Sequence, residues 1–120
     1  MKKAVFLNFP THGCINGLLA TAAELVARGH RLIYYCSDEF KPKIERIGAE
    51  FRSYQGLIND FKIPNYDLFK ALQRSVDMTV DKLDHNLAAI QKENPDYIVH
   101  DSLCTWGKHM AAILRLPAAT

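Results

Sequence analysis

The sequence has no hydrophobic run long enough to cross a bilayer, and its charges do not favour one sign. No stretch approaches the roughly 18 consecutive apolar residues that a spanning helix needs. An early apolar run follows two lysines, as in a signal peptide, but Asn8 and Pro10 interrupt it. The net charge is +2, and basic and acidic residues are interspersed. We therefore expect a cytoplasmic protein that binds neither nucleic acid nor membrane.

Cysteine is scarce, which limits disulfide and metal chemistry. The three cysteines form no CxxC pair and no zinc-ribbon spacing, and their odd number does not suit a disulfide framework. A reducing compartment fits this pattern. Four side chains of zinc-ligand type could converge in the fold, namely His12, Cys14, Asp101 and Cys104. No local ligand spacing supports such a site, so we expect no metal.

Nucleotide-binding motifs are also missing. The first glycine-containing turn has Gly13 and Gly17 but not GxGxxG, and no GK[ST] sequence marks a phosphate-binding loop. Cys14 has no arginine at the spacing of a phosphatase loop. We expect no bound cofactor.

Strand-like and helix-like segments alternate along the chain. Apolar or β-branched runs predict strands over residues 4–9, 32–36, 50–53 and 97–100. Apolar residues at helical spacing predict helices over residues 16–28, 38–47, 65–93 and 104–114. A further strand begins near residue 117. The alternation predicts right-handed crossovers and an α/β fold, a Rossmann-like, doubly wound parallel sheet.

Several residues mark the expected element boundaries. Asn16 is a suitable N-cap for the first helix, and Gly29 can end it. Ser37 or Asp38 can cap the second helix. Residues 54–64 read as a loop.

The stretch FPTHGCING, residues 9–17, is the strongest candidate for a functional site. It joins the first strand to the first helix, and turns of this kind lie at the edge where α/β proteins bind ligands. If the first and fourth strands are neighbours, the turn after His100 faces the same crevice. Asp101 opens that second turn, where it serves either function or the capping of the helix near Cys104.

Linked motifs then indicate a family. They are GCING at 13–17, RGH at 28–30, EF at 39–40 and GAEF at 48–51, and PDYIVHDSLCTWGKHMAAILRLPAAT follows at 95–120. Together they resemble the N-terminus of macrolide-type glycosyltransferases of the UDP-glycosyltransferase superfamily, which have the GT-B fold. The family pattern has Gly-His-x-Asn-Pro in the first turn, and a Pro-Asp strand with an Asp turn later. The resemblance covers essentially the whole chain.

The resemblance implies a two-domain enzyme that transfers a sugar from a nucleotide-sugar donor, such as a UDP-sugar, to a hydroxyl of a small-molecule acceptor with inversion. Residues 1–120 would be its acceptor-side N-terminal domain, incomplete and without the donor-binding C-terminal domain. Such a fragment is expected to be inactive alone. Its exposed apolar edge could drive self-association.

The resemblance also assigns roles to individual residues. A His in the first turn of the family removes the acceptor proton, and an Asp after the fourth strand orients that His. Asp101 matches the Asp, whereas Cys14 occupies the His position. A thiol with a pKa of about 8.5 is a poor base beside a carboxylate, because the nearby negative charge disfavours the thiolate. His12 is a candidate substitute base.

The acceptor pocket of the family lies in the loop after the third strand and in the next helix. Four residues fall there in this sequence, namely Phe61, Ile63, Tyr66 and Phe69. Periodicity alone places Phe69 in the core.

A different class of protein is the alternative, a stand-alone flavodoxin-like domain that binds or regulates without transferase activity. The native reading frame distinguishes the two hypotheses. Continuation into a second α/β domain with a nucleotide-sugar motif supports the transferase, and a stop codon after Thr120 opposes it.

Overall fold

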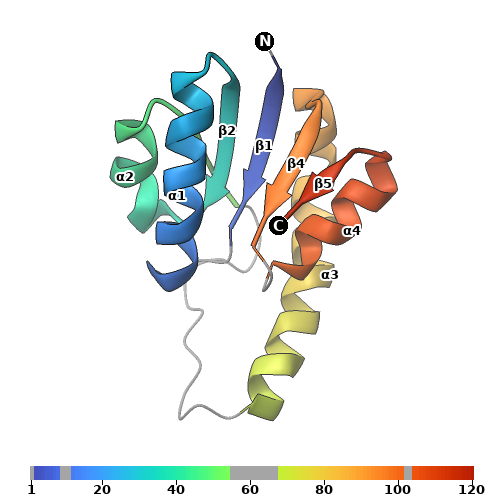
Figure 1. Cartoon of the computed structure of the whole chain (residues 1–120). Coiled ribbons are helices and arrows are strands. Elements are labelled where there is room, and N and C mark those ends of the chain that lie inside the picture. The colour runs from blue at the N-terminus through green and yellow to red at the C-terminus, as the bar shows by residue number, and fades with distance from the viewer. Residues whose placement is uncertain (1, 9–11, 55–67, 102–103) are drawn as a thin grey trace.

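One parallel sheet organises the chain. The computed structural model describes residues 2–8, 12–54, 68–101 and 104–120. Its strands are β1 (Lys3–Leu7), β2 (Arg31–Cys36), β3 (Glu50–Ser53), β4 (Tyr97–His100) and β5 (Ala118–Ala119). They pair in parallel in the order β3-β2-β1-β4-β5 (Figure 1). The predicted α/β class is confirmed, and the strand order reverses between β1 and β4 as expected.

Helices cover both faces of the sheet. The helix α1 (His12–Ala27), the 3₁₀ turn η1 (Asp38–Phe40) and the helix α2 (Lys41–Arg46) lie on one face (Figure 1). The helices α3 (Leu68–Glu93) and α4 (Thr105–Leu114) lie on the other. Alternate strand residues enter the two cores, so Phe6 and Tyr34 pack in one cluster and Leu7 and Tyr35 in the other. Burial on both faces explains the nearly continuous apolar runs of the strands.

The first helix begins earlier than the sequence pattern indicated. It begins at His12, so Asn16 is an exposed residue inside α1 and the predicted N-cap is wrong. Ile15 is fully buried in the core between α1 and the sheet. We attribute the early start to this burial, which offsets the weak helix propensity of the nearby glycines. Gly29 follows the helix at φ +89°, a left-handed conformation that fits its predicted role.

The second helical region is divided in two. Ser37 is the N-cap of η1, but its side chain makes no capping hydrogen bond. The helix α2 follows directly, with Pro42 in its first turn.

The long helix α3 extends beyond the sheet. Its 26 residues make it about 39 Å long, whereas the five residues of β1 span only about 17 Å. Figure 1 shows its N-terminal part projecting past the strand ends. Phe69 in that part is 86% exposed, so the core position that periodicity predicted for it is wrong. Residues 65–67 lie outside the described residues. No helix in the described ranges is both long and apolar enough to span a membrane.

Gly107 allows α4 to pack tightly against the end of β4. A Cβ atom placed on Gly107 would lie 2.6 Å from Cβ of His100 and 2.9 Å from its Cγ. Both residues are buried, and neither atom of His100 is the end of a flexible chain. Only glycine fits here without a shift of the helix or the strand.

We predict that Gly107→Ala destabilises the domain. Overpacking of this kind costs about 1–3 kcal/mol, which exceeds the gain of up to about 1 kcal/mol in helix propensity. Urea unfolding followed by circular dichroism measures the change. Gly17→Ala is the matched control, because nothing lies within 4 Å of a Cβ at Gly17 in α1, so that variant should gain stability. Equal stability of the two variants would contradict the steric argument.

Candidate active site

The candidate site lies where β1 and β4 end side by side. Leu7 of β1 pairs with His100 of β4, so the residues that follow them, Asn8 and Asp101, are neighbours. The Nδ2 atom of Asn8 donates a hydrogen bond of 2.8 Å to Oδ2 of Asp101. The helix α1 begins at the same edge of the sheet (Figure 1). This is the position at which open α/β sheets bind ligands.

Asn8 is held from both faces of the sheet. It is fully buried, and its Oδ1 accepts a hydrogen bond of 2.5 Å from the hydroxyl of Tyr34, on the α1 side. Its backbone carbonyl accepts a bond of 3.1 Å from the hydroxyl of Tyr54, which belongs to the cluster on the α3 side. Its backbone amide donates to the carbonyl of Tyr35 at 3.3 Å. Asn8 therefore has little freedom to move relative to β2.

A cluster of aromatic side chains holds the Tyr54 hydroxyl that bonds Asn8. Nε1 of Trp106 donates to the hydroxyl of Tyr54 at 3.2 Å, and the two rings meet edge to face with centroids 5.7 Å apart. Tyr35 also packs against Tyr54, at 5.8 Å between ring centroids. Trp106 and Tyr54 are almost completely buried. The phenol hydroxyl of Tyr54 is thus fixed in position.

A buried lysine also contacts this cluster. Nζ of Lys82 on α3 lies 5.4 Å from the ring centroid of Tyr54 and 3.3 Å from Oδ2 of Asp81. The side chain of Lys82 is fully buried, and this burial lowers its pKa, while Asp81 opposes the shift. The contact is a cation–π interaction for the ammonium form.

The Tyr35 and Tyr54 hydroxyls and the Cys36 and Cys104 thiols remain protonated near neutral pH. Burial raises the pKa of Tyr35 to about 12 and that of Tyr54 well above its ordinary value. Burial likewise raises the pKa of Cys36 to about 12, and burial together with the charge of Asp101 raises that of Cys104 far above its ordinary value. The Tyr54 hydroxyl acts as a hydrogen-bond donor, and these two cysteines are not nucleophiles.

Asp101 lies at the edge where β1 and β4 end. Its backbone carbonyl accepts from Nδ1 of His100 at 3.0 Å and from the amide of Cys104 at 3.1 Å. Cys104 itself is the N-cap of α4, and its side chain makes no capping hydrogen bond. The carboxylate is partly exposed and accepts a hydrogen bond from Asn8. A fixed, accessible carboxylate can orient a base or stabilise its protonated form.

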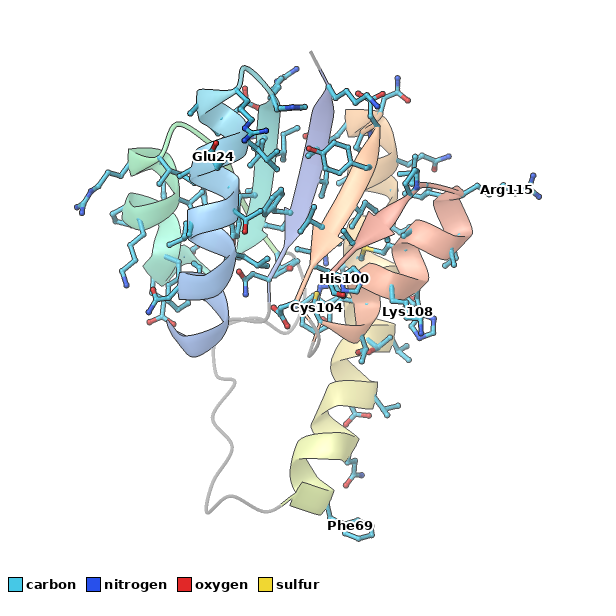
Figure 2. The ribbon with its side chains drawn as sticks, viewed as in Figure 1. Glu24, Phe69, His100, Cys104, Lys108 and Arg115 are labelled. Carbon is cyan, nitrogen blue, oxygen red and sulfur yellow. The ribbon has the colours of Figure 1, made fainter. Side chains whose placement is uncertain are left out.

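Most of the other predicted site residues have side chains outside the described part of the structure. His12 and Cys14 lie in the first turn of α1, but their side chains are outside the described part of the structure. Phe61, Ile63 and Tyr66 also lie outside the described residues. Phe69 is described, and Figure 2 shows it at the end of α3 remote from His100 and Cys104. Among the side chains that are described, no three of metal-ligating type form a cluster.

Sequence reasoning missed Asn8, Tyr34, Tyr54 and Lys82. Asn8 had a usable signal, because a polar residue that ends a buried strand next to a glycine-containing turn must find hydrogen-bond partners. The tyrosines are ordinary strand residues in the sequence. Lys82 lies within the amphipathic pattern of residues 65–93 and gives no indication of burial.

The chain is similar in sequence to known glycosyltransferases, in agreement with the resemblance found in its motifs. No protein-family model matches the chain. Over 123 residues it is 29% identical to an uncharacterized UDP-glucosyltransferase, YojK, of Bacillus subtilis, covering 98% of the chain and 30% of that protein. It is 31% identical over 120 residues to the NDP-glycosyltransferase YjiC of Bacillus licheniformis, covering 92% of the chain and 30% of the relative. The chain thus spans about 30% of the length of these relatives.

A solved structure agrees with the sequence relatives. The calicheamicin glycosyltransferase CalG4 has a TM-score of 0.81 and 26% identity to this chain, covering 98% of the chain and 31% of CalG4. These matches confirm the resemblance to macrolide-type glycosyltransferases of the GT-B fold.

We predict that Cys36 and Cys104 do not react with thiol reagents in the folded protein. At pH 8, a pKa of about 12 leaves on the order of one thiol in ten thousand ionised, and both side chains are buried. The experiment uses a Cys14→Ser variant and an aromatic disulfide reagent at pH 8. Modification should begin only on unfolding, and the same variant in denaturant should release two equivalents. Rapid reaction of the folded variant would contradict the burial of these thiols.

Proposed function

We propose that this chain, which matches macrolide-type glycosyltransferases of the GT-B fold along nearly its whole length, is the acceptor-side part of such an enzyme. The reaction would transfer a sugar from a nucleotide sugar to a hydroxyl of a small molecule, with inversion at the anomeric carbon. The observation that carries the proposal is the carboxylate of Asp101, fixed by Asn8 at the edge where β1 and β4 end.

A carboxylate at this place would assist the chemistry of the transfer. An acceptor hydroxyl must lose its proton as it attacks the sugar, and a neutral imidazole is suited to take it near neutral pH. The imidazole becomes cationic in that step, and a carboxylate beside it stabilises the positive charge. Asp101 would fill this role.

This chain departs from the family pattern at the residue that is expected to act as the base. Cys14 stands where the family has His. Its thiol would have to ionise near Asp101, and the two negative charges would repel each other. We propose His12, two residues earlier in the first turn of α1, as the group that accepts the proton.

The nature of the relatives suggests the substrates. Their names specify UDP or NDP sugars as donors, and CalG4 is named for calicheamicin. We propose a nucleoside-diphosphate sugar as donor and a small hydroxylated molecule as acceptor for this protein. We propose that the donor-binding half has no counterpart in these 120 residues, since they align with about 30% of each relative. We therefore do not expect these residues alone to catalyse transfer.

We predict that Asp101→Asn lowers kcat/KM by at least about 100-fold in the polypeptide that the native reading frame encodes, because acid–base groups contribute about 100- to 10,000-fold. Release of nucleoside diphosphate from a panel of nucleotide sugars and phenolic acceptors measures the rate. Asp84→Asn is the matched control, since Asp84 is an exposed carboxylate on α3.

Two results would overturn the proposed function. One is a native reading frame that ends at Thr120, which would favour a stand-alone binding domain. The other is a full-length protein that releases no diphosphate with any donor and acceptor, or one in which Asp101→Asn and Asp84→Asn behave alike.

We predict that Cys14→His increases the rate of transfer and that His12→Ala abolishes it. The first substitution restores an imidazole at the position where the family has His, and the second removes the proposed base. The two variants are compared in the same diphosphate-release assay, with Cys14→Ser as the control for loss of the thiol. Full activity of His12→Ala would exclude His12 as the base, and an unchanged rate in Cys14→His would count against the argument that the thiol is deficient.

A further inference from the structure

We propose that Asn8, with its amide oriented by Tyr34, is a positioning residue that sets the direction of the Asp101 carboxylate for the transfer step. This inference rests on the proposed function. It concerns the buried side chains of Asn8 and Tyr34, and not the base or the carboxylate itself.

The direction of the Asn8 amide follows from its two partners. The Tyr34 hydroxyl lies 2.5 Å from Oδ1, and Nδ2 lies 2.8 Å from Oδ2 of Asp101. Rotating the amide by half a turn would bring its oxygen against a carboxylate oxygen, where no proton separates them. The Tyr34 hydroxyl donates to the amide oxygen, and the amide NH₂ donates to the carboxylate. The chain of donors therefore runs in one direction, from β2 to Asp101.

Burial makes this chain rigid. Asn8 and Tyr34 are both fully buried, and the Tyr34 ring packs 5.4 Å from that of Phe6, centroid to centroid. A buried amide that loses a partner costs more than the bond itself is worth, so the network resists partial opening. Asp101 is only partly buried. Its carboxylate would rotate more freely without the fixed donor at Oδ2.

A fixed carboxylate matters because transfer depends on geometry. A displacement of about 1 Å in a catalytic arrangement can cost about 100-fold in rate. Asn8 does not need to touch substrate to influence the rate in this way. Its effect must instead pass through Asp101, which makes the inference testable by the coupling between variants.

Tyr34 and Tyr35 provide a matched pair on one strand. They are adjacent in β2, and their rings lie in opposite clusters, Tyr34 toward α1 and Tyr35 toward α3. The hydroxyl of Tyr34 bonds the Asn8 side chain, whereas the contact described above between Tyr35 and Asn8 runs through the backbone carbonyl of Tyr35. Replacing either tyrosine by Phe removes one hydroxyl and leaves the ring in place.

The experiment is a double-mutant cycle in the full-length protein, measured by diphosphate release and by urea unfolding. Asn8→Ala should lower kcat by about 10-fold or more and leave KM for both substrates within about 2-fold. In an Asp101→Ala background, the same substitution should change kcat by less than about 2-fold. Tyr34→Phe should lower kcat less than Asn8→Ala and should have no further effect on an Asn8→Ala protein, whereas Tyr35→Phe should leave kcat unchanged.

Each other outcome decides against the inference. If Asn8→Ala lowers kcat equally with and without Asp101, Asn8 acts only through the fold. The same conclusion follows if the loss of kcat across the variants is proportional to their loss of unfolding free energy. If Asn8→Ala does not fold or Asp101→Ala has no measurable turnover, the comparison of Tyr34→Phe with Tyr35→Phe decides. Equal kcat in those two variants would overturn the role. An inactive wild-type protein would instead overturn the proposed function, and the role of Asn8 with it.

Discussion

The parallel pairing of β1 with β4 determines which residues meet at the carboxyl edge of the sheet. Its register joins Leu7 to His100, and this alone makes Asn8 and Asp101 neighbours although 93 residues separate them in sequence. A slip of one residue would turn every side chain of the strand to the opposite face. The two apolar cores on either side of the sheet oppose such a slip. The geometry of the candidate site is thus a consequence of core packing.

Four of the polar side chains that enter the core form a connected set. Asn8, Tyr34, Tyr54 and Trp106 are buried and joined by hydrogen bonds that reach from β2 and α4 to the end of β1. Unpaired buried polar groups are costly, so each member requires the others in place. The partly exposed Asp101 is the point at which this internal network meets solvent. This arrangement allows a rigid interior to act on an accessible carboxylate.

The sequence pattern was sufficient for most of the architecture and for the position of Asp101. Strands buried on both faces read as apolar runs, and the alternation with helices determines a parallel sheet. Local signals failed where tertiary packing outweighs them. Burial of Ile15 extends α1 past the suitable cap at Asn16. Helical periodicity gives the face of Phe69 but not how far α3 projects beyond the sheet.

Position 107 has no room for a side chain, because the Cβ of His100 lies too close to it. The space for the imidazole of His100 exists because position 107 carries a hydrogen atom where every other residue has a carbon. A side chain at position 107 would meet the Cβ of residue 100 itself, so only glycine at position 100 would make room for it. Related sequences that keep this packing and have a side chain at position 100 should therefore keep glycine at position 107, and an alignment can reveal the contact between α4 and β4 without a structure.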